Sequence, residues 1–376
     1  MIKILNVLSD TNIGGAGKCL LTYLDNYDAQ NFAVSVILPQ GSLLIPQVEQ
    51  RGVEVYTIDN AADSSFKLSA IKKYKKLIRQ IAPDIVHTHA SMSARIAAKR
   101  LGLKVVYTRH SVFDPPKSIS TWPGKQINGL INNKTCHKII AVAEAAKENL
   151  LKTGINGKKI TVILNGISGL RQVTQQETDE FRQRFGISPG QKVASMIARL
   201  EDVKGHKYFI NAAKLVLEQG IDAKFLIAGT GVVEQSLKEL VSQLGLEKSV
   251  IFTGFLQDVA PLVSASDIIA NASYGTEATS IALLEGMSVG KVSVVSDFGG
   301  NPGVIEQGVN GLVFKTHDQQ GMADCLARLF KDEALYEEMS KNARRVFEEK
   351  FTAKAMTRQM EQLYASLIKT NQTGKE

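Results

Sequence analysis

The sequence lacks the features of a secreted or membrane-spanning protein. Its 376 residues include only three cysteines, Cys19, Cys136 and Cys325, whose number and spacing fit neither a disulfide framework nor a metal-ligand motif. No apolar run approaches the roughly 18 residues needed to cross a bilayer, and the N-terminal MIKILNVLSD turns polar too early for a secretory signal. We therefore expect free thiols and a cytoplasmic location, with peripheral contact at the inner face of the cell membrane as the alternative.

Two familiar nucleotide-binding motifs are incomplete. The segment with Gly229 and Gly231 has Glu234 where the dinucleotide fingerprint needs a third glycine, which disfavours NAD binding. Near the N-terminus, NIGGAGKC departs from the phosphate loop of ATPases at its first glycine and at its final serine or threonine, which disfavours a Walker-type ATPase. Gly14 and Gly15 still predict a flexible loop after the first strand that can present backbone amides to a phosphate or a sugar.

What the sequence does contain is a regular α/β pattern. Its composition of 44% hydrophobic and 22% charged residues is that of an ordinary globular protein with a large core, and its length suggests two domains. Short β-branched runs such as IKILNVL, DIVHTH and KVVYTRH alternate with amphipathic stretches, which predicts parallel strands with helical crossovers. We expect an α/β protein with two Rossmann-like doubly wound domains that face each other across a cleft.

The expected domain boundary lies at the turn-rich LNGISGL and the polar run QVTQQETDE. We place the first domain at residues 1–168, the second at 169–352, and a C-terminal helix within 353–376 that crosses back to the first domain. Five strands are expected in the second domain, at KVASMIARL, AKFLIAG, SVIFTGF, DIIANAS and KVSVVSDFGG, and helices alone from about His317 onward. Because ligands bind beyond the carboxyl ends of parallel strands, functional residues should directly follow strands.

Charge is divided unevenly along the chain. The net charge is +8, but residues 1–168 hold 22 Lys and Arg against 11 Asp and Glu, whereas the remainder is slightly acidic. A basic half can meet a phosphorylated acceptor, an anionic lipid surface or nucleic acid, and charge alone does not choose among them. No aromatic stacking pattern accompanies the basic residues, which disfavours nucleic acid.

The basic residues are densest in KLSAIKKYKKLIRQIAP, where helical spacing predicts one apolar and one basic face. The apolar face consists of Leu68, Ile71, Leu77, Ile78 and Ile81. The basic face consists of Lys67, Lys72, Lys73, Lys75, Lys76 and Arg79. The simpler interpretation is an outer helix with a solvated basic face. The alternative is docking on an anionic membrane, where each basic residue near the surface contributes ~1 kcal/mol.

The segment NASYGTEATSIALLEGMSVGK follows a predicted strand and carries two glutamates. We place Glu277 in a loop and Glu285 about one and a half turns into a helix that begins near Thr279. The unpaired first-turn N–H groups of that helix would be those of Ser280, Ile281 and Ala282. Such donors, at the positive end of the helix dipole, suit a diphosphate, while Glu285 can bind a ribose diol and Glu277 a sugar hydroxyl. The alternative is that both glutamates are capping or surface carboxylates.

Two cations and two glycines follow other predicted strands. Arg199 ends a strand and Lys204 lies five residues later, just before a new helix. The forked guanidinium and the compact ammonium can together stabilise a departing diphosphate, although both could equally cap an exposed loop. Gly229 and Gly231 follow the next strand, where a backbone without side chains lets a nucleotide approach closely.

In this order, the motifs resemble those of the family 4 glycosyltransferases of the GT-B fold, and the likeness covers nearly the whole chain. It is carried by GGAG, TRHSVF, VILNGI, ARLEDVKG, IAGTG and VIFTGF, and above all by the two glutamates of TEATSIALLEGMSVGKVSVVSDFGGNPGVI. The resemblance implies retaining transfer of a hexose from a nucleotide-diphosphate sugar, held mainly by the second domain. The acceptor, a glycan or a lipid-linked molecule, would be held by the first domain, in bacterial surface-polysaccharide synthesis.

Carried over one residue at a time, the resemblance assigns roles in the second domain. It implies that Arg199 and Lys204 contact the diphosphate, that Glu285 contacts the ribose, and that Glu277 contacts the donor sugar. The backbone around Phe255 would border the base. The donor nucleotide sugar is thus a substrate, and no separate cofactor is implied.

Three histidines lie at strand ends in the first domain. His110 ends KVVYTRH, and the resemblance places it near the reacting sugar. Its expected role is a hydrogen bond to a donor hydroxyl, or support of developing positive charge through its carbonyl, rather than proton abstraction. For His87 and His89 of the sequence HTH, we expect one side chain to face the core and one to face solvent, with structural roles and no metal.

The sequence contains no Asp-x-Asp, the usual carrier of a divalent metal on donor phosphates. Arg199, Lys204 and the helix N-terminus would take its place, which predicts metal-independent activity. A donor phosphate oxygen would then take the acceptor proton on the face from which the leaving group departs, which gives retention. Two alternatives stay open. A nucleotide-sugar epimerase would need carboxylates and histidines to converge where we place only His110, and the other alternative is a non-catalytic sugar-nucleotide-binding protein.

Overall fold

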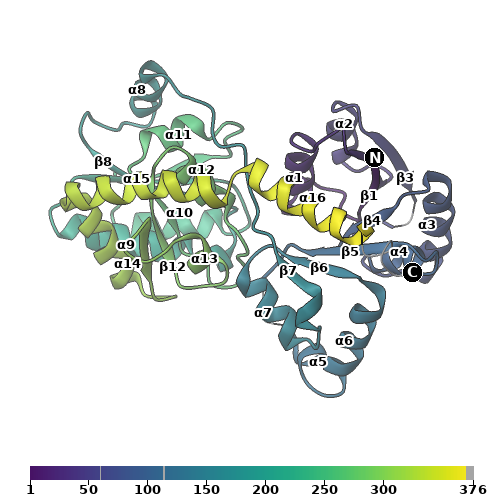
Figure 1. Cartoon of the computed structure of the whole chain (residues 1–376). Coiled ribbons are helices and arrows are strands. Elements are labelled where there is room, and N and C mark those ends of the chain that lie inside the picture. Colours follow the sequence, from purple (N-terminus) through teal and green to yellow (C-terminus); the bar gives the residue numbers. More distant parts are fainter. Residues whose placement is uncertain (60, 113–114, 370–376) are drawn as a thin grey trace. The chain divides into compact units, whose positions relative to one another are not determined.

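The computed structural model describes residues 1–59, 61–112 and 115–369 (Figure 1). The chain divides into two compact units. The N-terminal unit consists of Met1–Ser168 together with the C-terminal segment that begins at Ala353, and the C-terminal unit consists of Gly169–Thr352. Each unit is built around one parallel sheet with helices on both sides.

The sheet of the N-terminal unit has seven parallel strands in the order β3-β2-β1-β4-β5-β6-β7. The strands are β1 (Ile2–Leu8), β2 (Phe32–Pro39), β3 (Glu54–Ile58), β4 (Ile85–His89), β5 (Lys104–Arg109), β6 (Lys138–Ala141) and β7 (Ile160–Val162). In the register of the central strand, Ile4 of β1 pairs with Val34 on one side and with Ile85 on the other. Strands covered on both faces are nearly continuous apolar runs, which is the pattern seen in the sequence.

Helices connect these strands, and the last helix of the chain joins them. They are α1 (Gly15–Leu24), α2 (Leu44–Glu49), α3 (Leu68–Ile81), α4 (Met92–Lys99), α5 (Lys117–Ser120), α6 (Gly124–Thr135), α7 (Glu144–Lys152) and α16 (Ala353–Lys369). Helix α16 contributes Met356, Met360 and Tyr364 to the same buried cluster as Leu20 and Tyr23 of α1. It is therefore part of the core of this unit and not a detached tail.

Helix α3 carries the predicted basic face but buries a different set of apolar residues. Its buried side chains are Ala70, Ile71, Tyr74 and Ile78. Leu68, predicted on the apolar face, is 71% exposed, because burial begins only at Ala70 and the first turn extends beyond the layer that the helix covers. The outer face is basic and open to solvent, as its spacing predicted.

The sheet of the C-terminal unit has six parallel strands in the order β10-β9-β8-β11-β12-β13. The strands are β8 (Lys192–Ile197), β9 (Ala223–Ala228), β10 (Val250–Gly254), β11 (Ile268–Asn271), β12 (Val292–Ser296) and β13 (Gly311–Phe314). The sequence predicted five of them and missed β13. This edge strand has only four residues, directly after a turn, and is recognisable only through its pairing with β12, such as Val294 with Leu312.

The helices of the C-terminal unit surround one large apolar core. They are α8 (Gln175–Arg184), α9 (His206–Glu218), α10 (Glu234–Gln243), α11 (Ala260–Ala265), α12 (Ile281–Ser288), α13 (Asn301–Val304), α14 (Gln319–Lys331) and α15 (Glu333–Lys350). At the centre, Phe209 of α9 and Phe225 of β9 are fully buried with their ring centroids 5.7 Å apart. A core of this size makes the sheet a rigid base for the loops that follow its strands.

Both sheets share a strand order that reverses direction once. In each, the chain first moves outward on one side of the first strand and then returns to its other side, so the direction reverses between β1 and β4 and between β8 and β11. In doubly wound sheets, ligands bind beyond the carboxyl ends of the strands at this reversal. Within the described ranges, every helix is too short or too polar to reach across a lipid bilayer.

Candidate functional site

In the C-terminal unit, the predicted site residues lie on loops at the carboxyl ends of four adjacent strands. The loop after β8 carries Arg199 and Lys204, and the loop after β11 carries Glu277. Since β8 and β11 are neighbours, these two loops border the reversal of strand order. The glycines after β9 and Phe255 after β10 continue the same edge of the sheet. The sheet therefore collects these residues along one of its edges, at the carboxyl ends of its strands.

The structure joins Lys204 and Glu277 directly. The Lys204 ammonium donates to Oε2 of Glu277 at 3.1 Å and to the carbonyl of Thr276 at 3.0 Å. The pair is mostly buried, with 14% and 9% of the two side chains exposed. An ammonium has three N–H donors, so one remains for a ligand after these two bonds. The sequence predicted roles for both residues but not that they form an ion pair.

One carboxylate oxygen of Glu277 is fully occupied and the other is not. Besides the ammonium, Oε2 accepts hydrogen bonds from Nδ2 of Asn271 at 3.1 Å and from Oγ of Ser273 at 3.0 Å. Within the described part of the chain, Oε1 accepts no hydrogen bond. Three donors thus fix the orientation of the carboxylate while one oxygen remains for a ligand hydroxyl.

A buried polar network supports this carboxylate. Asn301 is fully buried, and its Nδ2 donates to Asn271 Oδ1 at 3.3 Å and to Ser296 Oγ at 3.1 Å. The hydroxyl of Ser296 in turn donates to the carbonyl of Ser273 at 2.6 Å. Sequence reasoning assigned no role to these residues. Their signal is the presence of polar side chains at the ends of the apolar strands β11 and β12, where a purely structural strand would stay apolar.

Glycines hold the loops around the pair by close backbone contact. A Cβ on Gly205 would lie 2.1 Å from the carbonyl oxygen of Ala272. A Cβ on Gly300 would lie 1.5 Å from that of Ala278, and Gly299 is similarly close to the carbonyl of Glu277. No side chain fits at these contacts, so the loop after β12 presses against the backbone that carries Glu277.

Gly229 and Gly231 serve the neighbouring loop in the same way. Their Cβ positions would lie 2.0 Å from the carbonyl oxygen of Ala198 and 2.3 Å from that of Leu200. These two carbonyls flank Arg199, so the glycines lock the loop that presents this arginine. This packing explains both glycines without a nucleotide. The predicted close approach of a nucleotide to their backbone stays a prediction.

Arg199 is the most exposed of the predicted charged residues. Its guanidinium pairs with Oε1 of Glu201 at 2.6 Å, and 72% of its side chain is open to solvent. Exposed pairs of this kind stabilise a fold by about 1 kcal/mol or less, so the guanidinium can exchange this partner for a ligand phosphate at little cost. Its backbone is fixed while its side chain is free to turn.

Helix α12 begins two residues later than predicted. It starts at Ile281, with Ser280 as its N-cap in an extended conformation, so Glu285 lies about one turn into the helix rather than one and a half. The Ser280 side chain makes no capping hydrogen bond. The first-turn N–H groups are therefore not satisfied by their cap, and the half-buried Glu285 lies on the same short helix.

Phe255 lies at the surface directly after β10. It is 74% exposed, although an aromatic ring of this size normally avoids water. The preceding Gly254 has φ +73°, and its carbonyl accepts a hydrogen bond from the N–H of Gly229 at 2.9 Å, which fixes the backbone at this corner. An exposed ring at the carboxyl edge of the sheet offers a stacking surface for a base.

In the N-terminal unit, His110 belongs to a cluster of three histidines. Its Nε2 lies 2.7 Å from Nδ1 of His89, whose Nε2 lies 3.2 Å from Oδ1 of Asn6. His87 bonds to Tyr364 and Thr108. The prediction that one of His87 and His89 faces solvent was wrong, because residues two apart in a strand lie on the same face, and both are buried. His110 is likewise not isolated.

Burial keeps these histidines uncharged. Desolvation lowers the pKa of His110 to about 4 and that of His87 to about 3, and it lowers the pKa of His89 as well. Assigning the Asn6 amide so that its oxygen accepts from Nε2 of His89 makes Nε2 of His110 the donor between the two rings. Nδ1 of His110 is then an acceptor, and it is buried without a partner.

The glycine loop after β1 has space around it. A Cβ on Gly14 or Gly15 would meet no atom within 4 Å, whereas one on Gly17 would touch Leu44 at 3.0 Å. Neither Gly14 nor Gly15 has a positive φ. Packing and backbone conformation therefore do not explain glycine at these two positions, which is consistent with close approach of a ligand.

Cys19, Cys136 and Cys325 are free thiols, as predicted. Among the described residues, no group of three or more His, Cys, Asp or Glu side chains is arranged to hold a metal ion. His87 and His89 thus have structural partners and no ligand set around them.

Models of glycosyltransferase families match both halves of the chain. Residues 177–346 match the model of the "Glycosyl transferases group 1" family, and residues 13–168 match that of "Glycosyltransferase Family 4". The chain is 27% identical over 323 residues to N-acetyl-alpha-D-glucosaminyl L-malate synthase of Bacillus anthracis, covering 82% of each chain. It is 25% identical to UDP-Gal:alpha-D-GlcNAc-diphosphoundecaprenol alpha-1,3-galactosyltransferase of Escherichia coli, covering 98% of this chain and 97% of that one.

Solved structures agree on the fold. The Anabaena protein Alr3699/HepE in complex with UDP superposes with a TM-score of 0.83 and 22% identity, covering 97% of this chain and all of the other. A glycosyltransferase of Rickettsia africae superposes with a TM-score of 0.84 and 22% identity, covering 98% and 99%. The predicted α/β architecture of GT-B type is thus confirmed. From the two family matches and this fold, we conclude that the chain belongs to the family 4 glycosyltransferases.

Proposed function

We propose that this glycosyltransferase takes a hexose from a nucleotide-diphosphate sugar held by its C-terminal unit and transfers it, with retention, to a glycan or lipid-linked acceptor held by its N-terminal unit. The observation that carries the proposal is the buried pair of Lys204 and Glu277 beside an uncapped helix N-terminus at the reversal of strand order. UDP is bound in the similar Anabaena structure, which makes it the first nucleotide to test.

The diphosphate is bound by positive charge from three sources. Lys204 contributes the N–H that its bonds to Glu277 and Thr276 leave over, and Arg199 exchanges Glu201 for a phosphate oxygen. The backbone N–H groups at the start of α12, those of Ser280, Ile281 and Ala282, complete the site. Because these donors are already positioned, they stabilise the charge that develops on the leaving group without reorganising.

The sugar and the nucleoside occupy the ends of this site. Glu277 accepts a hydroxyl of the donor sugar through Oε1 while Oε2 stays fixed by its three donors. Glu285 binds the ribose diol, and Phe255 stacks on or borders the base. The fixed carboxylate orients the sugar relative to the diphosphate, so binding and positioning come from the same residue.

Retention follows from the route of the proton. The anomeric bond to the diphosphate breaks, a phosphate oxygen of the leaving group takes the acceptor proton, and the acceptor oxygen forms its bond on the same face. His110 contributes a hydrogen bond through its unpaired Nδ1, or its carbonyl, to the reacting sugar. Its lowered pKa makes it a weak base, which agrees with a supporting role.

We also propose that the reaction needs no divalent metal. Lys204, Arg199 and the helix N-terminus supply the positive charge that a metal otherwise brings to donor phosphates. The activity should then persist in excess EDTA. Complete loss in EDTA with recovery on adding Mg²⁺ or Mn²⁺ would contradict this part. NMR of the product decides the stereochemistry, since a product anomer opposite to that of the donor excludes retention.

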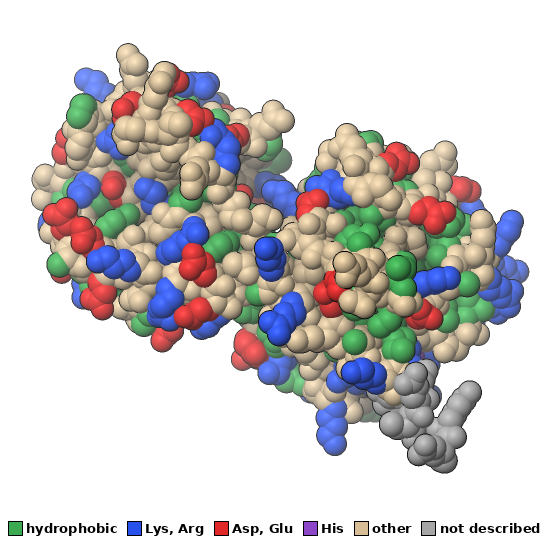
Figure 2. Space-filling view, turned by 45° about the horizontal axis from the view of Figure 1, so that its top comes forward, with side chains coloured by type: hydrophobic (Ala, Val, Ile, Leu, Met, Phe, Trp, Pro, Cys, Tyr) green, Lys and Arg blue, Asp and Glu red, His purple; other side chains and the backbone are tan. Residues whose placement is uncertain are grey.

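A membrane contact would suit a lipid-linked acceptor. Figure 2 shows Lys and Arg side chains gathered along the edge of the N-terminal unit where α3 lies. At the start of this helix, Phe66 and Leu68 are 51% and 71% exposed, so apolar side chains accompany the charge. We propose peripheral docking of α3 on anionic membrane. Equal flotation with neutral and anionic vesicles would contradict it.

The donor site is tested by thermal unfolding with UDP, GDP and ADP. A nucleotide at 100 times its Kd should raise the free energy of unfolding by ~2.7 kcal/mol. In Lys204→Met the affinity for the same nucleotide should fall at least tenfold, because an N–H donor and a positive charge to the phosphates are lost. Lys214→Met, which breaks an exposed pair with Glu218, is the matched control and should bind normally. If no nucleoside diphosphate stabilises the native protein, the proposed function is wrong.

A further inference from the structure

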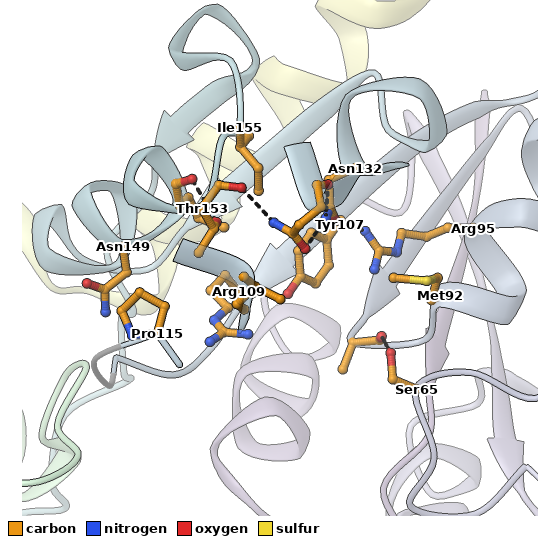
Figure 3. Close-up of a pocket in the computed structure, with 14 residues that line it drawn as sticks. Ser65, Met92, Arg95, Tyr107, Arg109, Pro115, Asn132, Asn149, Thr153 and Ile155 are labelled. Carbon is orange, nitrogen blue, oxygen red and sulfur yellow. Dashed lines mark hydrogen bonds between the residues drawn. The ribbon is translucent and has the colours of Figure 1, made fainter. Parts of the chain in front are cut away.

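The N-terminal unit contains a pocket that none of the predicted residues lines. It has a volume of about 250 Å³ and lies beside the carboxyl end of β5, among the first turn of α4 and helices α5, α6 and α7 (Figure 3). Sites for whole drug-sized molecules are about 300–1,000 Å³, so this pocket suits one chemical group and a short attachment. Because its walls belong to one unit, its geometry does not depend on the other.

Arg95 is one of two charged side chains among the described residues that line this pocket. It is 3% exposed, and its guanidinium lies 4.3 Å from the centroid of the Tyr107 ring. One terminal nitrogen donates to Oδ1 of Asn132 at 2.7 Å and to Sγ of Cys136 at 3.4 Å. Its Nε is buried without a hydrogen-bond partner. Within the described part of the chain, no carboxylate pairs with it.

An arginine buried in this way is costly to the fold. A charge removed from water without an opposite charge destabilises a protein by several kcal/mol, and a neutral amide and an aromatic face offset only part of that cost. Surface arginines avoid it by turning outward, but the bond to Asn132 and the stacking on Tyr107 hold this side chain inward. The positive charge of Arg95 therefore lacks an opposite charge among the described residues, and a bound anion would supply it.

The remaining walls define what kind of anion fits. Arg109 supplies a second guanidinium, whose Nε donates to the carbonyl of Ser111 at 3.2 Å. None of the described residues that line the pocket is acidic. The apolar lining residues are Met92, Pro115, Ile119, Leu150 and Ile155. The forked donors of the Arg95 guanidinium suit the oxygens of a phosphate, and the apolar wall suits a hydrocarbon attached to it.

Hydrogen bonds fix the orientation of the two asparagines Asn128 and Asn132 in the pocket. Asn132 Nδ2 donates to the carbonyl and to Oδ1 of Asn128, at 2.9 and 3.0 Å, which turns its oxygen toward Arg95. Asn128 Nδ2 donates to the carbonyl of Thr153 at 2.8 Å. These bonds connect the carbonyl of Thr153, which follows α7, through two residues of α6 to the guanidinium. The orientation of Arg95 is thus set before any ligand arrives.

We propose that this pocket binds a phosphate group of the acceptor, with Arg95 as its principal partner and the adjoining part of the acceptor against the apolar wall. This inference rests on the proposed function, and it narrows the acceptor to a phosphorylated molecule. The phosphate can belong to a soluble molecule or to a lipid-linked diphosphate, and the chemistry of recognition is the same. The basic balance of residues 1–168 supports either source.

The test is calorimetric titration of the full-length protein with inorganic pyrophosphate, in saturating UDP so that the donor phosphate site is filled. We expect binding that weakens at least tenfold in Arg95→Met and changes less than twofold in Arg100→Met. Arg100 follows directly after the same helix and is exposed, so it matches the loss of charge without touching the pocket. UDP should bind equally to all three proteins.

A second variant tests the pocket independently, in case Arg95→Met does not fold. Ile119→Trp fills the pocket from a partly exposed position without altering its charge, and it should also weaken pyrophosphate binding at least tenfold. Tighter binding of geranyl diphosphate than of pyrophosphate identifies a lipid-linked source, and equal binding identifies a soluble one. The proposal is overturned if pyrophosphate does not bind in the presence of UDP, or if Arg95→Met, Ile119→Trp and Arg100→Met bind it equally. Failure of UDP itself to bind would instead overturn the donor site.

Discussion

The ion pair between Lys204 and Glu277 makes a measurable prediction about energetic coupling. At 3.1 Å and an effective dielectric constant of about 20, the gross attraction of the two charges is about 5 kcal/mol. Both side chains are largely removed from water, so desolvation offsets much of this value. We expect a coupling free energy of about 1–3 kcal/mol in a double-mutant cycle.

The variants Lys204→Met and Glu277→Gln separate the two contributions. In Lys204→Met, the carboxylate keeps Asn271 and Ser273 but loses its counter-charge. In Glu277→Gln, an amide oxygen can still accept those bonds, whereas Lys204 keeps only the carbonyl of Thr276. Each change should cost about 2–4 kcal/mol, and the double variant should cost clearly less than the sum, because no buried charge is then left alone.

Urea unfolding at pH 7 measures the four free energies. The slope with denaturant should stay the same in all variants, since the surface exposed on unfolding does not change. Lys214→Met is the control for loss of a lysine and should cost less than about 0.5 kcal/mol, because its pair with Glu218 is exposed and 3.8 Å long. A coupling below 0.5 kcal/mol would refute the view that this pair is a buried electrostatic unit.

Three further predictions concern neighbouring features. Between pH 6.5 and about 4, the unfolded chain binds a proton at His110 that the folded protein does not bind. As the pH is lowered through this range, the free energy of unfolding should therefore decrease by roughly 3 kcal/mol because of this residue. The urea midpoints at pH 7 and pH 4.5 should differ less in His110→Asn than in the native protein. Gly300→Ala should destabilise the protein by more than about 2 kcal/mol, because its new Cβ would overlap the carbonyl oxygen of Ala278. A Cβ on Gly303 would have no atom within 4 Å, so Gly303→Ala should leave thermal unfolding unchanged. Gly15→Ala should leave stability unchanged or slightly higher but raise the KM for a substrate, and an unchanged KM would show that nothing approaches this glycine.

Most of the fold was predictable because its signals are local and repeated. Strand and helix alternation gave the doubly wound architecture, and the spacing of α3 gave its basic face. The exceptions are short elements and element ends. The edge strand β13 has four residues, and the start of α12 depends on the backbone conformation of Ser280, which no side-chain pattern encodes.

The candidate site was only partly predictable because its key contacts join distant loops. Lys204 and Glu277 were named as separate ligands of a substrate, but 73 residues separate them, and only the adjacency of β8 and β11 makes them a pair. Arg95 was missed for another reason. It lies beside exposed Lys99 and Arg100 in the sequence, so it resembles one more surface cation. Its local signal is the run of small and apolar residues around it in MSARIAAK, which predicts a buried helix face.

The histidine cluster offers a test of the proposed route of the acceptor proton. His110 is the histidine of this cluster with an unpaired ring nitrogen, but desolvation lowers its pKa to about 4, so at neutral pH it is a poor acceptor for a hydroxyl proton. This agrees with the proposed mechanism, in which a phosphate oxygen of the donor diphosphate takes the acceptor proton. A pH–rate profile between pH 5.5 and 8 should accordingly show no inflection near 6.5, and His110→Asn should lower kcat without shifting that profile. An inflection near 6.5 that disappears in His110→Asn would instead make this histidine the base and would exclude proton transfer to the leaving phosphate.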